Sequence, residues 1–221
     1  MYFQNGPSHS VRSVNDGLLS AKAPATAGAF DASYVDYTAT SGMTTRFHDT
    51  TGGGPLFYPD LAENDAKGLT YTTAPLEQDL VVAGHPIVTL FATSTAPDGE
   101  FDGYLEDVDQ FGFSTFLSDG FIRALNRTIG KPFYSNFGLP WPTDSRADAD
   151  RVPFLSAGVA KIVLTLQPIA ARFKAGHRLR ITIQGADADS TLTFPAVPPP
   201  KVTIMRDPSY PSRVTLPVLS Q

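Results

Sequence analysis

Apolar and polar side chains alternate along several short segments of the chain. Within Arg178–Gln184, the side chains of Leu179, Ile181 and Ile183 share one face of an extended strand, and the intervening polar residues share the other. Residues 161–166 repeat this period of two. Alternation of this kind predicts strands with one apolar face and one polar face.

Further strands are predicted along the rest of the chain. Residues 86–94 are mostly apolar and rich in β-branched side chains, which is typical of a central strand covered on both faces. Residues 104–108, 201–206 and 213–218 are also predicted as strands, while residues 121–128 fit a strand or a short helix equally well. Many short strands separated by Gly and Pro turns predict an all-β sandwich or barrel and argue against alternating strands and helices.

The bulk composition supports one globular domain. The chain has 221 residues, 42% of them hydrophobic, with 15 Phe and 8 Tyr, so it can bury a substantial core. We assign residues 17–221 to a single β-sandwich domain. Residues 1–16 are interpreted as a linker, a tag remnant or an irregular N-terminal segment, because Tyr2-Phe3-Gln4 resembles the end of a protease-cleavable linker.

Charge and residue counts exclude several classes of function. The formal net charge of −5 makes nucleic acid a poor partner, because an acidic surface repels phosphate. The absence of cysteine rules out disulfides and thiolate metal sites but leaves the compartment open, so a cytoplasmic and a secreted origin both remain. No apolar run approaches the length that spans a bilayer, so no membrane role is predicted. No cofactor is predicted either.

The sequence offers no recognisable catalytic motif. The nearest approach to Gly-x-Ser-x-Gly is residues 112–116, which lack the closing Gly, so Ser114 is interpreted as a strand residue. No zinc-binding pair of the His-x-x-x-His or His-Glu-x-x-His type occurs among the histidines, which are His9, His48, His85 and His177. A structural hydrogen bond is the favoured role for His177, because no partner for a catalytic base is evident nearby.

Six acidic residues crowd into twelve positions: Asp98, Glu100, Asp102, Glu106, Asp107 and Asp109. Several carboxylates close together are compatible with a calcium site. The spacing does not match an EF-hand loop, however, and a solvated hairpin edge is the favoured interpretation. No metal ligand is therefore assigned.

A local basic cluster stands out in this acidic chain: Arg172, Lys174, His177, Arg178 and Arg180. It fits a polar strand face in water, or a docking surface on which Arg forms bidentate pairs with carboxylates of a partner. We favour docking for Arg178 and Arg180, whose spacing places both on one face. The predicted docking surface comprises Arg172, His177, Arg178, Arg180 and Trp141.

Residues 130–153 form a long irregular stretch that contains four prolines and the single Trp. A stretch of this length in a compact domain is normally functional or packed against a neighbour. Its aromatic side chains are Phe133, Tyr134, Phe137 and Trp141. If they face a missing partner, the isolated domain is expected to self-associate.

Several motifs, in order, resemble the C-terminal domain of the CocE/NonD hydrolases, which are relatives of X-Pro dipeptidyl-peptidases and cocaine esterase. The likeness covers about residues 30–218. The motifs are Val35-Asp36-Tyr37-Thr38-Ala39, Thr45-Arg46, Gly68-Leu69-Thr70-Tyr71-Thr72-Thr73-Ala74-Pro75-Leu76, Val82-Ala83-Gly84-His85-Pro86, Ser94-Thr95-Ala96-Pro97-Asp98-Gly99, Tyr104-Leu105-Glu106-Asp107-Val108-Asp109, Gly120-Phe121-Ile122-Arg123-Ala124, Arg172-Phe173-Lys174-Ala175-Gly176-His177-Arg178-Leu179-Arg180-Ile181 and Ser212-Arg213-Val214-Thr215-Leu216-Pro217.

The resemblance implies a jelly-roll sandwich of the galactose-binding-like type that packs on an α/β-hydrolase domain and helps to wall its substrate pocket. In that family the Ser, Asp and His triad lies in the preceding domain, so no residue here inherits a catalytic role. The parent protein would hydrolyse esters, amides or X-Pro dipeptides. The alternative is a carbohydrate-binding module that uses Trp141, Tyr134 and Phe137. One departure from the family pattern, Asp102-Gly103, predicts a kinked or bulged strand.

Overall fold

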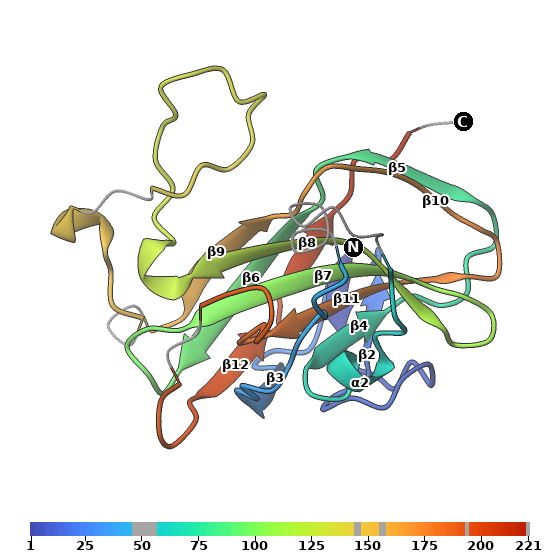
Figure 1. The fold of residues 1–221 in the computed structure, drawn as a ribbon, viewed down its shortest axis with the longest axis horizontal. Helices are drawn as coiled ribbons and strands as arrows, with labels where there is room; N and C mark the ends of the chain where they lie inside the picture. The colour runs from blue at the N-terminus through green and yellow to red at the C-terminus, as the bar shows by residue number, and fades with distance from the viewer. Residues whose placement is uncertain (46–56, 144–146, 155–157, 193–194, 220–221) are drawn as a thin grey trace.

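Strands are the main regular elements of the computed structural model, which describes residues 1–45, 57–143, 147–154, 158–192 and 195–219 (Figure 1). The strands are β1 (Tyr2–Gln4), β2 (Gly17–Ser20), β3 (Phe30–Tyr34), β4 (Leu69–Thr72), β5 (Leu80–Gly84), β6 (Ile87–Ser94), β7 (Glu100–Val108), β8 (Ser114–Arg123), β9 (Ala160–Thr165), β10 (Ile169–Phe173), β11 (Arg178–Gln184), β12 (Lys201–Met205) and β13 (Arg213–Thr215). The helical elements are the short helix α2 (Ala62–Asp65) and 3-10 turns at Ala124–Asn126 and Asp148–Asp150. Among the described residues, no helix has the length and apolar character needed to cross a membrane.

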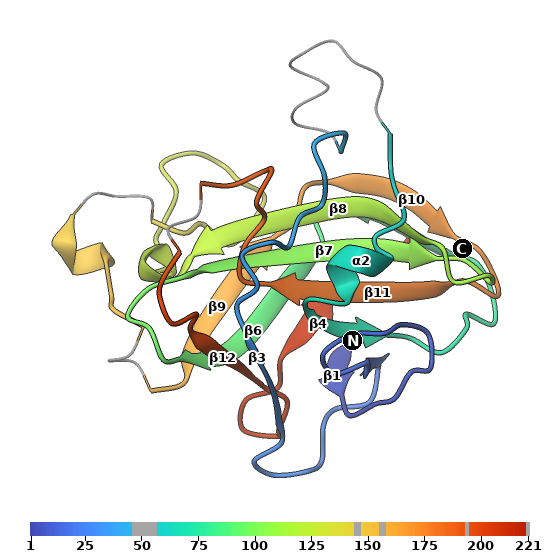
Figure 2. The same cartoon turned by 60° about the horizontal axis from the view of Figure 1, so that its bottom comes forward.

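Two groups of strands form the layers of a β-sandwich (Figure 2). One group runs β3-β12-β6, with β9 also paired to β6, and the other runs β4-β11-β7-β8. Strands β13, β1 and β2 join the two groups into one continuous sheet. The pairs within this sheet are antiparallel apart from β2 with β4, and β5 pairs separately with β10. The predicted all-β sandwich is confirmed.

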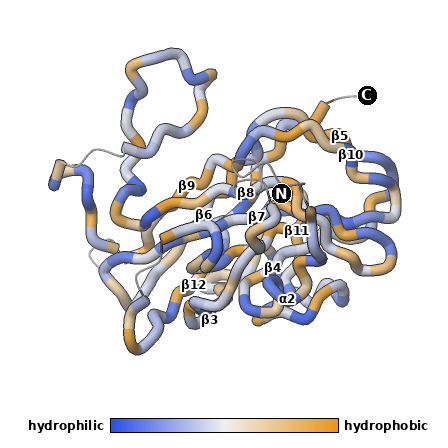
Figure 3. The backbone as a smooth tube through the Cα atoms, in the orientation of Figure 1, coloured by the Kyte–Doolittle hydropathy of each residue, from blue (hydrophilic) through white to orange (hydrophobic). Residues whose placement is uncertain are grey.

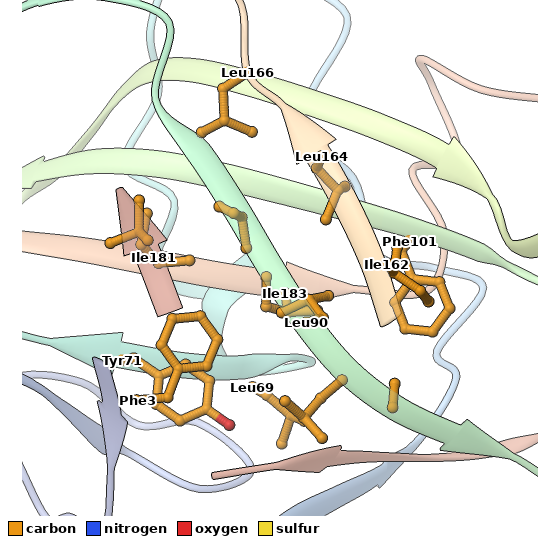
Figure 4. Close-up of a cluster of buried hydrophobic side chains, with 14 of the residues drawn as sticks. Phe3, Leu69, Tyr71, Leu90, Phe101, Ile162, Leu164, Leu166, Ile181 and Ile183 are labelled. Atoms are coloured by element: carbon orange, nitrogen blue, oxygen red, sulfur yellow. The ribbon is translucent and has the colours of Figure 1, made fainter. Parts of the chain in front are cut away.

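The core lies between these two layers. Leu179, Ile181 and Ile183 of β11 are buried, as their alternation predicts, and they belong to the same cluster as Leu90 of β6 and Ile162 of β9 (Figure 4). Burial of a side chain of this size contributes roughly 1.5–3 kcal/mol. The apolar faces of the predicted strands therefore form the inside of the sandwich.

Most predicted strands appear within a few residues of their expected bounds. The largest differences are at β7, which begins four residues before the predicted start at Tyr104, and at β13, which ends at Thr215. Residues 121–128, for which a strand and a short helix were both predicted as possible, contain some of each. Strand β8 ends at Arg123, and a 3-10 turn follows.

Residues 1–16 belong to the sandwich. Strand β1 pairs with β13 and β2, and Phe3 is fully buried with its ring stacked 3.9 Å from that of Tyr71. Further along, Ser10 accepts a hydrogen bond from Arg180. The sheet thus begins at Tyr2, whereas the sequence pattern placed the start of the domain at residue 17.

The strand irregularity predicted at Asp102-Gly103 lies elsewhere. Gly103 pairs regularly with Gly120, and the register shifts three residues further on, between Leu105 and Glu106. A Cβ atom on Gly120 would lie 2.8 Å from the carbonyl oxygen of Thr165, so β8 needs glycine where it passes close to β9.

One loop extends away from the two layers (Figure 1). We call residues 129–142 the aromatic arm. Its two ends are held together by a bridge between Ile129 and Pro142 and by a hydrogen bond from Gly130 N to Trp141 O. Figure 3 shows apolar stretches within this projecting loop as well as along the strands. The arm thus carries apolar side chains beyond the body of the sandwich.

Candidate functional site

The polar face of β11 is covered. Pairing of β11 with β7 places Arg180 opposite Glu106, Thr182 opposite Tyr104, and Gln184 opposite Asp102, all on the face that points away from the core. The short helix α2 lies over this face (Figure 2), and Gln184 donates a hydrogen bond to the carbonyl oxygen of Asn64. We call the covered polar layer the polar seam. It comprises Asp65, Glu100, Asp102, Tyr104, Glu106, Arg180, Thr182 and Asp187.

At one end of the polar seam, Arg180 is 1% exposed and extensively hydrogen-bonded. Its guanidinium donates to Asp65 Oδ2 at 2.6 Å, to Thr72 Oγ1 at 3.0 Å and to Ser10 O at 3.1 Å, and Glu106 Oε2 lies 3.7 Å away. The docking role predicted for Arg180 is therefore wrong, because a guanidinium bonded inside the domain cannot reach a partner. Two of its partners, Asp65 and Ser10, come from α2 and residues 1–16, which strand alternation does not reveal.

Two carboxyl groups share this single guanidinium. Burial raises the pKa of Glu106 well above its usual range, and the nearby Asp65 carboxylate raises it further. Burial also raises the pKa of Asp65, against the lowering effect of Arg180. Ser114 Oγ donates to Glu106 Oε2 at 2.5 Å. Ser114 is thus a buried residue at the start of β8, as predicted, and its hydroxyl is already engaged.

The other end of the polar seam is acidic. Asp187 accepts hydrogen bonds from Ser41 Oγ at 2.6 Å and from Tyr104 Oη at 2.9 Å. Asp102 is 3% exposed, and its Oδ2 atom has no hydrogen-bond partner among the described residues. Burial raises the pKa of Asp102 well above its usual range, and the charges of Glu100 and Asp187 add to this effect.

Neither interpretation of the acidic run describes this arrangement. Asp102 and Glu106 are buried in the polar seam, so the solvated hairpin edge is wrong for these two, whereas Glu100 is only partly buried. Within the described ranges, no group of three or more His, Asp or Glu side chains could hold a metal ion. Asp98 and Asp109 instead accept hydrogen bonds from backbone N–H groups of neighbouring turns.

His177 has a carboxylate partner that the sequence did not reveal. Its Nδ1 lies 2.9 Å from Asp107 Oδ1, and both side chains are mostly buried. The pairing of Leu179 with Asp107 in the β7–β11 ladder brings the two together across the sheet. In the described structure no serine is hydrogen-bonded to this pair. His85 lies 2.9 Å from the carbonyl oxygen of Leu166, and His48 lies outside the described residues.

The other members of the predicted docking surface lie on separate elements. Arg172 is on β10, with an exposed side chain and an ion pair to Asp79 of 3.6 Å. Arg178, at the start of β11, donates to Thr73 O at 3.0 Å. Trp141 is on the aromatic arm. Docking through Arg172, His177, Arg178 and Trp141 remains a prediction.

The aromatic arm presents the most exposed aromatic rings of the described residues. Phe133 and Phe137 are 93% and 95% exposed. The ring of Phe133 lies 5.2 Å from that of Tyr134, and Tyr134 lies 5.1 Å from Trp141, both edge to face. The rings of Phe133, Tyr134 and Trp141 thus pack on one another, while Phe137 extends into solvent on the same arm.

A pocket of about 810 Å³ lies beside the end of β8. Its walls come from the start of β7, the end of β8, the loop after β11 and the base of the aromatic arm. Glu100, Phe121, Pro142 and Leu192 are among the lining residues. The pocket therefore adjoins the acidic end of the polar seam through Glu100.

Sequence comparisons connect the chain with hydrolases. The model of the X-Pro dipeptidyl-peptidase C-terminal non-catalytic domain matches residues 1–215. A Mycobacterium bovis protein named "Putative serine esterase Mb1866c" is 40% identical over 207 residues, which cover 92% of this chain and 32% of that protein. A Mycobacterium tuberculosis protein with the same description gives the same figures. The chain thus spans about a third of the length of these relatives.

Structural comparisons agree on the fold. An α-amino acid ester hydrolase superposes on 99% of this chain with a TM-score of 0.67 and 19% identity, using 36% of its own length. An aminopeptidase from a marine sediment Thaumarchaeota archaeon covers 100% with a TM-score of 0.65 and 21% identity, using 37% of its length. A CocE/NonD family hydrolase from Staphylococcus aureus covers 99% with a TM-score of 0.59 and 14% identity, using 36% of its length.

Proposed function

The chain belongs to the family of X-Pro dipeptidyl-peptidase C-terminal non-catalytic domains, and on that premise we propose that it is the accessory domain of a serine hydrolase. In this role it packs on the α/β-hydrolase domain of the parent protein and shapes access of an ester, amide or X-Pro dipeptide substrate. It catalyses nothing on its own. The parent domain supplies the nucleophile, base and acid, and acyl transfer proceeds there.

The arrangement of candidate nucleophile and base supports a non-catalytic role. A serine hydrolase requires a serine within hydrogen-bond reach of a histidine that is oriented by an acid. Ser114 donates to Glu106 in the buried seam, whereas His177 is paired with Asp107 on the opposite face of β7. The described residues therefore provide a His–Asp pair without a serine.

The main support for packing on a hydrolase domain is the exposed aromatic arm. Monomeric proteins rarely display contiguous apolar patches unless a partner covers them, and aromatic residues are enriched in the buried centre of interfaces. The arm holds Phe133 and Phe137 almost fully exposed. The curated relatives are about three times as long as the aligned segment, which offers a hydrolase domain as the covering partner.

A reconstitution in trans tests this proposal. The N-terminal two thirds of the Mycobacterium bovis relative, expressed without its C-terminal third, would be mixed with this chain and assayed by size exclusion and p-nitrophenyl ester hydrolysis. We expect a one-to-one complex with restored hydrolysis. The double variant Phe133→Ser/Phe137→Ser should weaken the complex at least about tenfold, since central aromatic side chains contribute about 2 kcal/mol or more each.

The matched control is Phe111→Ser. Phe111 is 86% exposed but lies in the turn between β7 and β8, away from the arm. Its replacement should leave complex formation unchanged. Equal binding by the arm double variant and the wild-type chain would contradict a docking role for the arm, and failure of the wild-type chain to bind would contradict the packing proposal itself.

The carbohydrate-binding alternative is less well supported by the arm. Stacking on a sugar needs an open ring face, whereas Tyr134 and Trp141 lie edge to face within one cluster with Phe133. A glycan array distinguishes the two roles. Selective binding of one glycan class that is abolished in Trp141→Ala would favour the carbohydrate-binding module.

A further inference from the structure

Among the described residues, the pocket beside β8 contains a carboxylate without a cationic partner. Glu100 lines the pocket, and Thr191 is its side-chain hydrogen-bond partner. Arg123 lies directly opposite Glu100 in the β7–β8 ladder but donates to Asp98 Oδ2 at 2.5 Å. Within the described parts of the chain, no salt bridge reaches Glu100.

A second carboxyl group lies behind this carboxylate. Asp102, two residues along on the same face of β7, is buried with one carboxylate oxygen unpartnered among the described residues. Burial raises the pKa of Glu100, and the charge of Asp187 raises it further. The buried guanidinium of Arg180 serves Asp65 and Glu106 at the other end of the polar seam. A cation that entered the pocket would therefore favour the ionised form of Glu100, which no cationic side chain of the described residues pairs with.

The remaining walls of the pocket combine apolar residues with polar ones, among them the ion pair between Arg123 and Asp98. Phe121 is 58% exposed, and it faces the same side of the sheet as Glu100, two positions away across the ladder. Leu192, Pro97 and Pro142 also line the cavity. Pockets for small molecules typically enclose about 300–1,000 Å³, with apolar walls and a few polar groups that orient the ligand. The volume of about 810 Å³ falls in this range.

We propose that this pocket binds a small organic ammonium ion that carries an aromatic or branched alkyl group. The ammonium group donates hydrogen bonds to the Glu100 carboxylate, and the apolar group packs against Phe121 and Leu192. An ammonium ion can be held by one carboxylate, whereas the described residues do not converge as metal ligands require. The inference uses only side chains of this chain and does not depend on the accessory role.

An NMR titration of the 221-residue chain tests the site. The two probes are 2-phenylethylammonium and its neutral analogue 2-phenylethanol, followed by amide shifts. We expect the ammonium probe to shift the start of β7 and the end of β8, and to bind at least about tenfold more tightly than the alcohol, as a charge-assisted hydrogen bond contributes. Equal affinity of the two probes, or shifts confined to other regions, would overturn the proposal.

Two variants with matched controls locate the binding groups. Glu100→Gln keeps the side-chain shape, relieves repulsion with Asp187, and should remove the preference for the ammonium probe, while Glu77→Gln on the surface should not. Phe121→Ala should weaken both probes about threefold or more because it removes apolar surface from the wall, while Phe111→Ala should leave both unchanged. Retention of the ammonium preference in Glu100→Gln would contradict the assignment, whatever the effect of Phe121→Ala.

Discussion

The two faces of β11 are both buried, but by different means. On the inner face, Leu179, Ile181 and Ile183 pack in the core between the layers, where burial alone stabilises them. On the outer face, Arg180 and Thr182 lie beneath α2 and are stabilised by specific hydrogen bonds to Asp65. The stability of the inner face depends on buried apolar area, whereas that of the outer face depends on hydrogen bonds to its buried polar groups.

This difference sets how each face responds to change. Truncation of an apolar side chain on the inner face leaves a cavity, and the destabilisation grows with the volume of that cavity. Removal of a charged partner on the outer face leaves a buried charge without a counter-charge. For each atom removed, this lowers the free energy of unfolding more than truncation on the inner face does. The outer face also titrates, because burial raises the pKa of Asp65, Asp102 and Glu106.

Replacement of Arg180 should have the largest effect on stability. Arg180→Met leaves Asp65 and Glu106 buried without their cation, so we expect the free energy of unfolding to fall by about 3–5 kcal/mol. Urea denaturation of the chain measures this. The triple variant Arg180→Met/Asp65→Asn/Glu106→Gln removes the charges together and should recover part of the loss. No recovery would show that the loss does not arise from the uncompensated charges of Asp65 and Glu106.

On the inner face, Leu179→Ala should reduce the free energy of unfolding by about 2–5 kcal/mol. Leu179 is fully buried in the core cluster, so truncation leaves a cavity. The effect should be nearly the same at about pH 5 and about pH 8, because no charge is involved. A loss below about 0.5 kcal/mol, the range usual for surface substitutions, would mean that the core is not packed as described.

The acidic end of the polar seam should make stability depend on pH. The pKa of Asp102 is higher in the folded state than in the unfolded chain, where a carboxyl titrates near about 3.9. The folded state therefore binds the proton more tightly, and this contribution is fully present below that value and is lost as the pH rises through the raised pKa. We expect the domain to be more stable at about pH 5 than at about pH 8.

Asp102→Asn checks the source of this dependence. The amide cannot ionise, so the variant should lose much of the pH dependence and gain stability at about pH 8 relative to the wild-type chain. Thermal unfolding at several pH values measures both effects. Unchanged pH dependence in the variant would assign it to the other seam carboxyls, Glu100, Glu106 and Asp65.

The smallest effect on stability is expected on the aromatic arm. Phe133→Ser should change the free energy of unfolding by no more than about 0.5 kcal/mol, because the ring is exposed. The same change should reduce self-association and binding of a hydrophobic dye, measured by analytical ultracentrifugation and fluorescence. Equal self-association in both proteins would mean that another surface holds the copies together.

The periodicity of the sequence was sufficient to predict the sandwich. Period-two alternation in β11 and β9 placed the inner side chains correctly, and the apolar run at residues 86–94 became the central strand β6. The N-terminal segment was harder to interpret because β1 has three residues and pairs with β13, from the other end of the chain. Pairing between such distant segments leaves no local pattern.

The environment of the polar face could not be predicted in the same way. Alternation shows that Arg178 and Arg180 share a face, but whether that face meets water depends on α2 and on residues 1–16, which lie far away in sequence. The partner of His177 was missed for a related reason, since Asp107 is brought opposite by strand register. Only the exposed arm aromatics stood out locally, through composition.

The most direct test of the non-catalytic role is labelling of the purified chain with a fluorophosphonate probe, together with hydrolysis of a p-nitrophenyl ester. Ser114 is buried and bonded to Glu106, and His177 has no serine beside it in the described structure. We therefore predict neither a labelled serine nor turnover above the uncatalysed rate. A stoichiometrically labelled serine with ester turnover would contradict the account and identify a nucleophile in this chain.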